Sequence, residues 1–218
     1  MSGVVASLRG RPSLTDDVYE AIKAMIMNDV VPPGGRLGID QLSRELEVSS
    51  TPVRESLVRL ESEGLARREA LRGYTATALL DRGQVDELFE FRGVIEPWAA
   101  ARAAQRHSES DLARLSAEVD SVMSLPSDDS YESYRSLVAH DERFHAQIAA
   151  MSGNEQLRAA FERMHCHLHL FRSRYRAAQG GATLAEHRAI LRSIAEGKPA
   201  AARASMATHL QQAHQRAT

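Results

Sequence analysis

The chain has 218 residues, enough for one large domain or two small ones, and its 43% hydrophobic content can supply a core. It has no apolar run of about 18 residues, no apolar N-terminal leader and a single cysteine, Cys166, so we expect no membrane span, no secretory signal and no disulfide framework. The formal net charge of −2 excludes a uniformly basic surface, and any nucleic-acid site must therefore be local. These totals predict a soluble protein of the cytoplasm.

Residues that cap or break helices divide the N-terminal third into short elements. Residues 1–11 show no apolar periodicity and are predicted to form a mobile N-terminal arm. A first helix is expected from Thr15, its cap, to the breaker Val31-Pro32-Pro33-Gly34-Gly35. An extended segment at Arg36–Ile39 follows, and Asp40 is expected to cap a short second helix.

A third helix is predicted after a tight turn at Glu47-Val48. Ser49-Ser50-Thr51-Pro52 combines capping hydroxyls with a proline in the first turn, which is typical of a helix start. The helix is expected to end at Glu63-Gly64 and to bury one apolar face, formed by Val53, Leu57 and Leu60. Two helices joined by a tight turn indicate a helix-turn-helix.

A wing follows directly, because Leu65–Glu69 and Gly73–Leu79 can pair as a two-stranded hairpin. The predicted winged helix-turn-helix domain spans residues 12–79, and its third helix would enter the major groove N-terminus first. The hydroxyls of Ser49, Ser50 and Thr51 can bind phosphate oxygens, and Arg54 can reach guanine or phosphate. In the wing, Arg72 beside Gly73 can approach the minor groove, which completes the candidate DNA contacts. Isolated arginines are more often solvated charges, so spacing alone leaves these contacts open.

Residues 80–218 are predicted to form an all-α antiparallel helical bundle, which makes the fold class mainly α. A long helix is expected from Val85 across Pro97, and a second one bears Leu112, Leu115 and Val119. The remaining helices are expected at Tyr131–Met151, Leu157–Tyr175, Leu184–Ile194 and Pro199–His214, with Gln179-Gly180-Gly181 as a breaker.

The first domain resembles the winged helix of the GntR family. The resemblance rests on Pro33-Gly34-Gly35-Arg36-Leu37, Gln41-Leu42-Ser43, Val48–Leu57, Leu60–Leu65 and Arg72-Gly73, all at family spacing. It implies a bacterial transcription regulator that binds operator DNA as a homodimer. Ser50 departs from the family's usual Ser-Arg-Thr-Pro, which removes a charge from the reading helix and implies an altered operator preference or weaker binding.

Spacing in the second domain allows a metal site. Asp141 and His145 lie four residues apart, on one face of one predicted helix. His187 and His209 lie on the last two helices, and a turn at Gly197 brings both to one level if those helices are antiparallel. Three imidazoles and a carboxylate suit Zn²⁺, Ni²⁺, Mn²⁺ or Fe²⁺.

A second constellation has the same spacing. His165 and His169 are also four residues apart, with Cys166 between them and His167 on another face. Spacing does not decide between this cluster and the Asp141 site.

The second domain also resembles a known family, the sensor domain of the FadR subgroup. The matching segments are His140–Ile148, Gly153–Leu157, Glu186–Ile190, Ile194–Gly197 and Met206–Leu210. The resemblance implies that Asp141, His145, His187 and His209 hold a divalent metal, Zn²⁺ or Ni²⁺ ahead of Mn²⁺ or Fe²⁺. His165, His167 and His169 match no ligand position, which implies that they line a pocket or the core.

The same resemblance implies a small organic acid as effector. Phe91–Pro97 matches the segment that supplies a pocket arginine, so Arg92 is the candidate partner of a carboxylate. An ion pair between Arg92 and Glu96 is the simpler alternative. Asn154 is expected to cap the next helix and, secondarily, to contact the pocket.

These inferences predict a repressor whose operator affinity changes when a carboxylate metabolite binds a metal-containing cavity, with no membrane partner and with the nucleoid as its location when bound. Two alternatives stay open. One is a metal-dependent hydrolytic enzyme using the Asp/His site, with Glu142 and Glu186 nearby in sequence. The other is a constitutive DNA binder with a structural metal.

Overall fold

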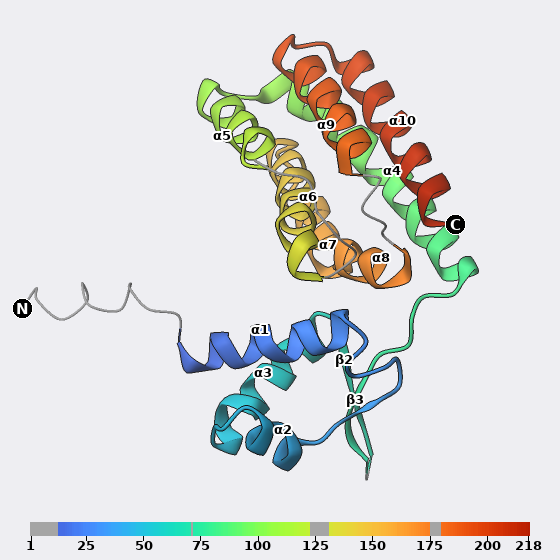
Figure 1. The fold of residues 1–218 in the computed structure, drawn as a ribbon. Coiled ribbons are helices and arrows are strands. Elements are labelled where there is room, and N and C mark those ends of the chain that lie inside the picture. The colour runs from blue at the N-terminus through green and yellow to red at the C-terminus, as the bar shows by residue number, and fades with distance from the viewer. Residues whose placement is uncertain (1–12, 71, 123–130, 175–179) are drawn as a thin grey trace, which may run out of the picture. The chain divides into compact units, whose positions relative to one another are not determined.

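The computed structural model describes residues 13–70, 72–122, 131–174 and 180–218, and the chain divides after Ala78 into two compact units (Figure 1). The fold class is mainly α, as predicted. The predicted arm at residues 1–11 lies outside the described residues, as does Leu71 in the wing. Among the residues that are described, no helix has the length and apolar character needed to cross a membrane.

The first unit is a winged helix with the predicted order of elements. These elements are α1 (Leu14–Met27), β1 (Arg36–Leu37), α2 (Ile39–Glu45), α3 (Ser50–Ser62), β2 (Ala66–Glu69) and β3 (Gly73–Ala76). Strand β3 lies in the middle of a three-stranded antiparallel sheet of order β1-β3-β2. The sheet thus ties the segment before the helix-turn-helix to the wing that follows it.

Two predicted caps are wrong. The N-cap of α1 is Ser13 rather than Thr15, because Ser13 and Asp16 each accept a backbone N–H from the other in a capping box. Thr15 instead donates a hydrogen bond of 3.0 Å to Glu55 of α3. Helix α2 starts at Ile39 after Gly38, so Asp40 lies inside the first turn, where its charge favours the helix N-terminus.

The core of the first unit is the contact between α1 and α3. The predicted face of α3, Val53, Leu57 and Leu60, is completely buried. Polar contacts at its edge hold the same two helices together, because Tyr19 donates a 2.6 Å hydrogen bond to Glu63 and the Arg59 guanidinium lies 3.6 Å from the Tyr19 ring centre. The face of α3 opposite to this core is therefore left to solvent.

The second unit is entirely helical in its described part. Its helices are α4 (Arg82–Arg106), α5 (Glu109–Asp120), α6 (Tyr131–Met151), α7 (Glu155–Met164), α8 (Cys166–Arg174), α9 (Gly180–Ala195) and α10 (Pro199–Ala217). The single helix predicted over Leu157–Tyr175 is wrong, because His165 adopts a left-handed conformation with φ of 44° and separates α7 from α8. Both glycines of the predicted breaker belong to α9, so this helix begins at Gly180 and not at the predicted Leu184; residues 175–179 lie outside the described part.

Helix α4 packs against α6, α9 and α10. Four alanines on α4, Ala99, Ala100, Ala103 and Ala104, are buried, and their small side chains let the neighbouring helices approach closely. Helix α4 continues through Pro97 as one helix. After the turn at Gly197, which has φ of 61°, α9 and α10 run side by side in opposite directions (Figure 1). This arrangement supplies the antiparallel pair that the proposed metal ligands require.

Candidate metal centre and nucleic-acid interface

Four side chains from three helices converge inside the second unit. Asp141 and His145 extend from α6, His187 from α9 and His209 from α10, and one ligand atom of each lies within 4.8 Å of the others. The Nε2 atom of His187 is 3.2 Å from Asp141 Oδ1, and the Nε2 atoms of His145 and His209 are 3.2 Å apart. Bonds of about 2.1 Å to one shared ion place neighbouring ligand atoms roughly 3.0 to 3.4 Å apart, so the two spacings of 3.2 Å suit a metal.

Two of the histidines direct their other ring nitrogen outward to a carboxylate. His145 Nδ1 lies 2.5 Å from Glu96 Oε2 of α4, and His209 Nδ1 lies 2.7 Å from Glu186 Oε2 of α9. An ionised carboxylate can only accept a hydrogen bond, so Nδ1 of each ring carries the proton and donates it. A neutral ring in this state presents Nε2 as a lone pair, which is the form that a metal needs.

The centre of the cluster therefore collects acceptors. The lone pairs of His145 and His209 and the carboxylate of Asp141 face the same small volume. Acceptors that face one another in a buried place repel unless a cation lies between them. The chemistry of the donor set thus fits a divalent ion with nitrogen and oxygen ligands.

Burial keeps two of the candidate ligands in the state that can bind a metal. It lowers the pKa of His145 to about 4 and that of His187 to about 3, so both rings are neutral near pH 7. Burial alone would raise the pKa of Glu186, but hydrogen bonds from His209 and from Arg216, at 2.7 and 2.8 Å, lower it to about 2. Glu186 is therefore ionised and can accept from His209.

Arg92 lies on α4 and pairs with Glu96, which lies beside this cluster. Its guanidinium is 2% exposed and donates to both oxygens of Glu96, with Nε 2.5 Å from Oε1. Although burial acts in the opposite direction, the Arg92 charge keeps the pKa of Glu96 well below its usual range. The predicted ion pair between Arg92 and Glu96 is present, and Glu96 connects Arg92 to the candidate ligand His145.

The sequence did not indicate that His140 contacts the candidate metal centre. His140 is fully buried on α6, and its Nε2 lies 2.9 Å from His187 Nδ1. Its Nδ1 lies 3.0 Å from the backbone oxygen of Glu118 and 3.1 Å from the Glu118 carboxylate, both on α5. Arg143 in turn donates two hydrogen bonds of 2.8 and 2.9 Å to that carboxylate. Residues on α5, α6 and α9 are too far apart in sequence for a local pattern to relate them. Only the folded structure therefore shows this series of hydrogen bonds.

The rival histidine cluster does not converge. Among the described residues, the only group of three or more possible ligands within reach of one ion is the Asp141 cluster. His165 forms the break between α7 and α8, and Cys166 is buried in an apolar cluster beside Phe161. The side chain of His167 lies outside the described part. Asn154 caps α7, where its side-chain oxygen accepts from two backbone N–H groups.

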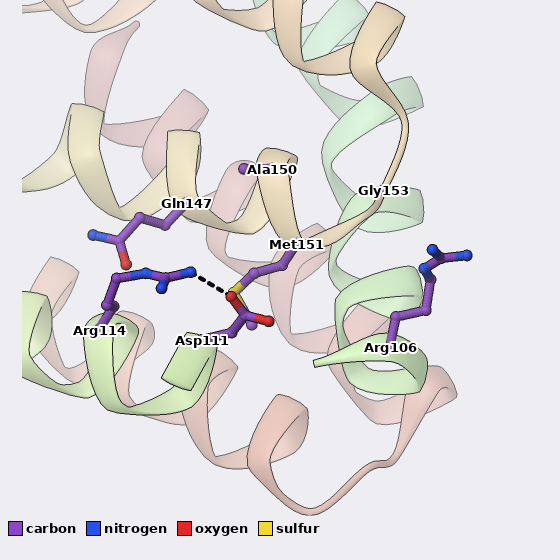
Figure 2. Close-up of a pocket in the computed structure, with 7 residues that line it drawn as sticks. All are labelled: Arg106, Asp111, Arg114, Gln147, Ala150, Met151 and Gly153. Carbon is purple, nitrogen blue, oxygen red and sulfur yellow. Dashed lines mark hydrogen bonds and ion pairs between the residues drawn. The ribbon is translucent and has the colours of Figure 1, made fainter. Parts of the chain in front are cut away.

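A cavity of about 400 Å³ lies where α4, α5 and α6 end or begin, and none of the four ligands lines it. Figure 2 shows Arg114 pointing to Asp111, with which it pairs, while Arg106 lies apart beside Gly153. Gly153 has φ of 72°, and a Cβ there would come within 3.0 Å of the Arg106 guanidinium. The positive φ therefore favours glycine at this turn. The arginines of this cavity provide a control for the proposed effector site at Arg92.

The predicted DNA contacts lie at the surface of the first unit. Ser49, Thr51, Arg54, Arg72 and Gly73 are exposed and Ser50 is half-buried. Ser49 is the N-cap of α3, but its side chain makes no capping hydrogen bond. Arg72 makes a weak surface contact of 3.4 Å with Glu69. These groups are placed so that a nucleic acid could reach them.

The sequence reasoning also missed Arg36. Strand β1 pairs with β3, and the register sets Arg36 opposite Thr75. Arg36 and Arg72 thereby line one hollow of about 280 Å³ together with Gly34 and Thr75. The extended segment predicted at Arg36–Ile39 was the available signal, but only the strand pairing shows that its arginine joins the wing.

Both units match known families. Residues 14–75 match the model for bacterial regulatory proteins of the gntR family, and residues 87–212 match the FCD domain. The chain is 25% identical over 193 residues to the HTH-type transcriptional regulator YdhC of Bacillus subtilis, covering 88% of this chain and 85% of that protein. It is 34% identical over 126 residues to the Nta operon transcriptional regulator of Aminobacter aminovorans, covering 57% of each. The solved structure of Escherichia coli McbR/YncC has the same fold, with a TM-score of 0.65 and 24% identity over 92% of this chain and 94% of that one.

Proposed function

The chain belongs to the gntR family of bacterial regulatory proteins and carries an FCD domain, so it is a DNA-binding transcription regulator and not an enzyme, and we propose that it acts as a repressor. We further propose that this repressor depends on a bound metal ion. In this proposal a small carboxylate binds at the centre formed by Asp141, His145, His187 and His209 and weakens operator binding. The observation that carries it is the convergence of three buried histidines and the partly exposed Asp141, from three helices, on one volume.

The proposed DNA surface combines the start of α3 with the wing. Ser49, Ser50 and Thr51 would contact phosphate oxygens through hydroxyl and backbone N–H groups, and Arg54 would reach guanine or phosphate. Arg36, Arg72 and Gly73 would contact the backbone or the minor groove from the wing. A homodimer would present two such surfaces to the half-sites of a pseudo-palindromic operator.

The proposed effector site uses the second unit's own charges. A divalent ion, Zn²⁺ or Ni²⁺ first and Mn²⁺ or Fe²⁺ next, would offer a Lewis-acidic position to a carboxylate oxygen. A guanidinium carries five N–H groups, and Arg92 uses two of them in its pair with Glu96. Its other N–H groups could donate to the carboxylate of the effector. Asn154 is a secondary candidate, because its side-chain oxygen is engaged at the cap of α7.

Linkage sets what the effector must do. An acid that binds the non-reading arrangement of the dimer more tightly than the reading one lowers operator affinity by the ratio of those two affinities. The proposal therefore requires a carboxylate whose own affinity falls when operator DNA is present.

Metal analysis of purified protein tests the centre. We expect about one divalent ion per chain in the wild type and a value near zero in His187→Ala. His214→Ala is the matched control, because His214 pairs with Asp86 outside the centre and its loss should leave the metal in place. Stoichiometric metal retained in His187→Ala would show that His187 is not a required ligand.

A thermal-shift screen of small mono- and dicarboxylates, followed by operator binding in fluorescence anisotropy, tests the effector. We expect an acid that stabilises the metal-loaded protein and weakens its operator binding, with no effect after Arg92→Gln. Arg114→Gln, which removes one of the two guanidinium groups that line the cavity of Figure 2, should keep the response. If no acid alters operator affinity at any metal loading, the metal is structural and the protein binds DNA constitutively.

A further inference from the structure

We propose that Glu118 and His140 form a relay that sets the tautomer of His187, and that this relay, and not only the four ligands, holds the centre ready for metal. This inference rests on the proposed metal site. In it, Glu118 and His140 keep His187, the one histidine of the site whose outer partner is not a carboxylate, in the state that can bind a metal. His145 and His209 each donate to a carboxylate, whereas His187 has another imidazole as its outer partner.

The direction of the hydrogen bond between the two imidazoles follows from the far end of the relay. His140 Nδ1 lies 3.0 and 3.1 Å from two oxygens of Glu118, a backbone carbonyl and a carboxylate. Both oxygens can only accept, so His140 Nδ1 must carry the proton. A neutral His140 then has no proton on Nε2, and that atom accepts.

The state of His187 follows in turn. Its Nδ1 is 2.9 Å from His140 Nε2, so Nδ1 of His187 carries the proton and donates it. The lone pair of His187 is thereby placed on Nε2, which faces Asp141 Oδ1 at 3.2 Å in the metal centre. With the opposite tautomer, His187 Nε2 would donate to Asp141 and could not bind a metal.

The relay is anchored at the surface. Glu118 is nearly buried, and the half-exposed Arg143 holds its carboxylate with two hydrogen bonds. His140 itself is fully buried and packs against the His187 ring, with ring centres 5.0 Å apart. Every polar atom of the His140 ring thus has a partner, and with both imidazoles neutral these contacts allow only one set of protons.

The test reads the tautomer and the metal separately. Long-range ¹H–¹⁵N spectra of the metal-free protein should show His187 protonated on Nδ1, and His140→Phe should shift it towards the Nε2-protonated form. Competition with a chromophoric chelator should show Zn²⁺ binding weakened about 10- to 100-fold in His140→Phe, although all four ligands remain. His140→Gln, whose amide can accept from His187 while donating to Glu118, should recover most of that affinity.

His214→Phe is the control for the same substitution outside the relay and should change neither readout. Should His140→Phe fail to fold, His140→Gln and the wild-type spectrum still decide, because wild-type His187 protonated on Nε2 overturns the relay. Unchanged Zn²⁺ affinity in His140→Phe also overturns it. Absence of Zn²⁺ binding in the wild type would instead refute the metal centre, and the metal-free spectrum would still test the relay.

Discussion

The two units place their proposed functional side chains in opposite surroundings. In the winged helix, Arg54 and Arg72 are exposed, and the core between α1 and α3 contains neither. In the second unit, His145, His187 and Arg92 are buried among the helices that form the core. In the first unit, the residues that stabilise the fold therefore differ from those proposed to bind DNA. In the second unit, the residues proposed to bind metal and effector are also part of the buried core.

The difference predicts how each unit responds to change. A substitution at an exposed contact should alter binding and leave the free energy of unfolding nearly unchanged. A substitution at a buried charge or ligand should alter both, because a buried polar group that loses its partner destabilises the fold. The following measurements test this contrast.

The largest effect is expected at the buried ion pair. Arg92→Ala should lower the free energy of unfolding by about 3–5 kcal/mol, because it leaves the Glu96 carboxylate buried with only His145 beside it. Arg67→Ala in the winged helix removes a pair with Glu69, but Arg67 is 71% exposed, and the loss should be at most about 1 kcal/mol. Urea unfolding of both variants measures the two values, and equal losses would abolish the contrast.

Removal of metal should act on one unit only. At a free metal concentration of about 100 times Kd, binding stabilises the folded state by about 3 kcal/mol, and a chelator should remove this amount. Hydrogen exchange should then accelerate in α6, α9 and α10, which carry the ligands, while α1 and α3 keep their protection. Uniform acceleration in both units would mean that the ion does not act through the second unit alone.

The loss of a reading residue should be confined to binding. Arg54→Ala should weaken operator binding by about 1–3 kcal/mol and change the unfolding free energy by less than about 0.5 kcal/mol. Arg114→Ala, which removes an exposed arginine of the second unit, is the control and should leave operator binding unchanged. A footprint of wild-type strength with Arg54→Ala would contradict its role as a contact.

The smallest effect is expected at Ser50. Ser50→Arg adds one cation near the start of α3 and should strengthen binding, with a salt dependence steeper by about one unit in the slope of log K against log salt. Anisotropy titrations at several salt concentrations measure the slope, and the same slope as wild type would show that this position does not approach a phosphate.

Local patterns predicted the winged helix well. The spacing of Val53, Leu57 and Leu60 and the proline after Thr51 depend only on neighbours in sequence, and the structure confirms the helix and its buried face. The cap of α1 was wrong although its signal was present, because Ser13 and Asp16 have the spacing of a reciprocal box and Thr15 does not.

The second unit depended more on contacts between distant segments. The pair Asp141 and His145 follows from helical spacing, and the turn at Gly197 explains how His187 and His209 meet. The helix break at His165 was unpredictable, because a left-handed conformation at a residue other than glycine needs support from tertiary contacts. The relay through Glu118 and His140 was also unpredictable, because its members lie far apart in sequence and share no local pattern.

The position of His209 on the last helix bears on the order of events during synthesis. Domains fold as units, N-terminal first, while a ribosome adds about 5–20 residues per second. The chain from Leu79 to His209 therefore takes on the order of 10 s to make after the winged helix is complete. During that interval each new molecule would contain the winged helix but not yet His209, so under our proposal the DNA-reading unit exists before the metal centre that would regulate it.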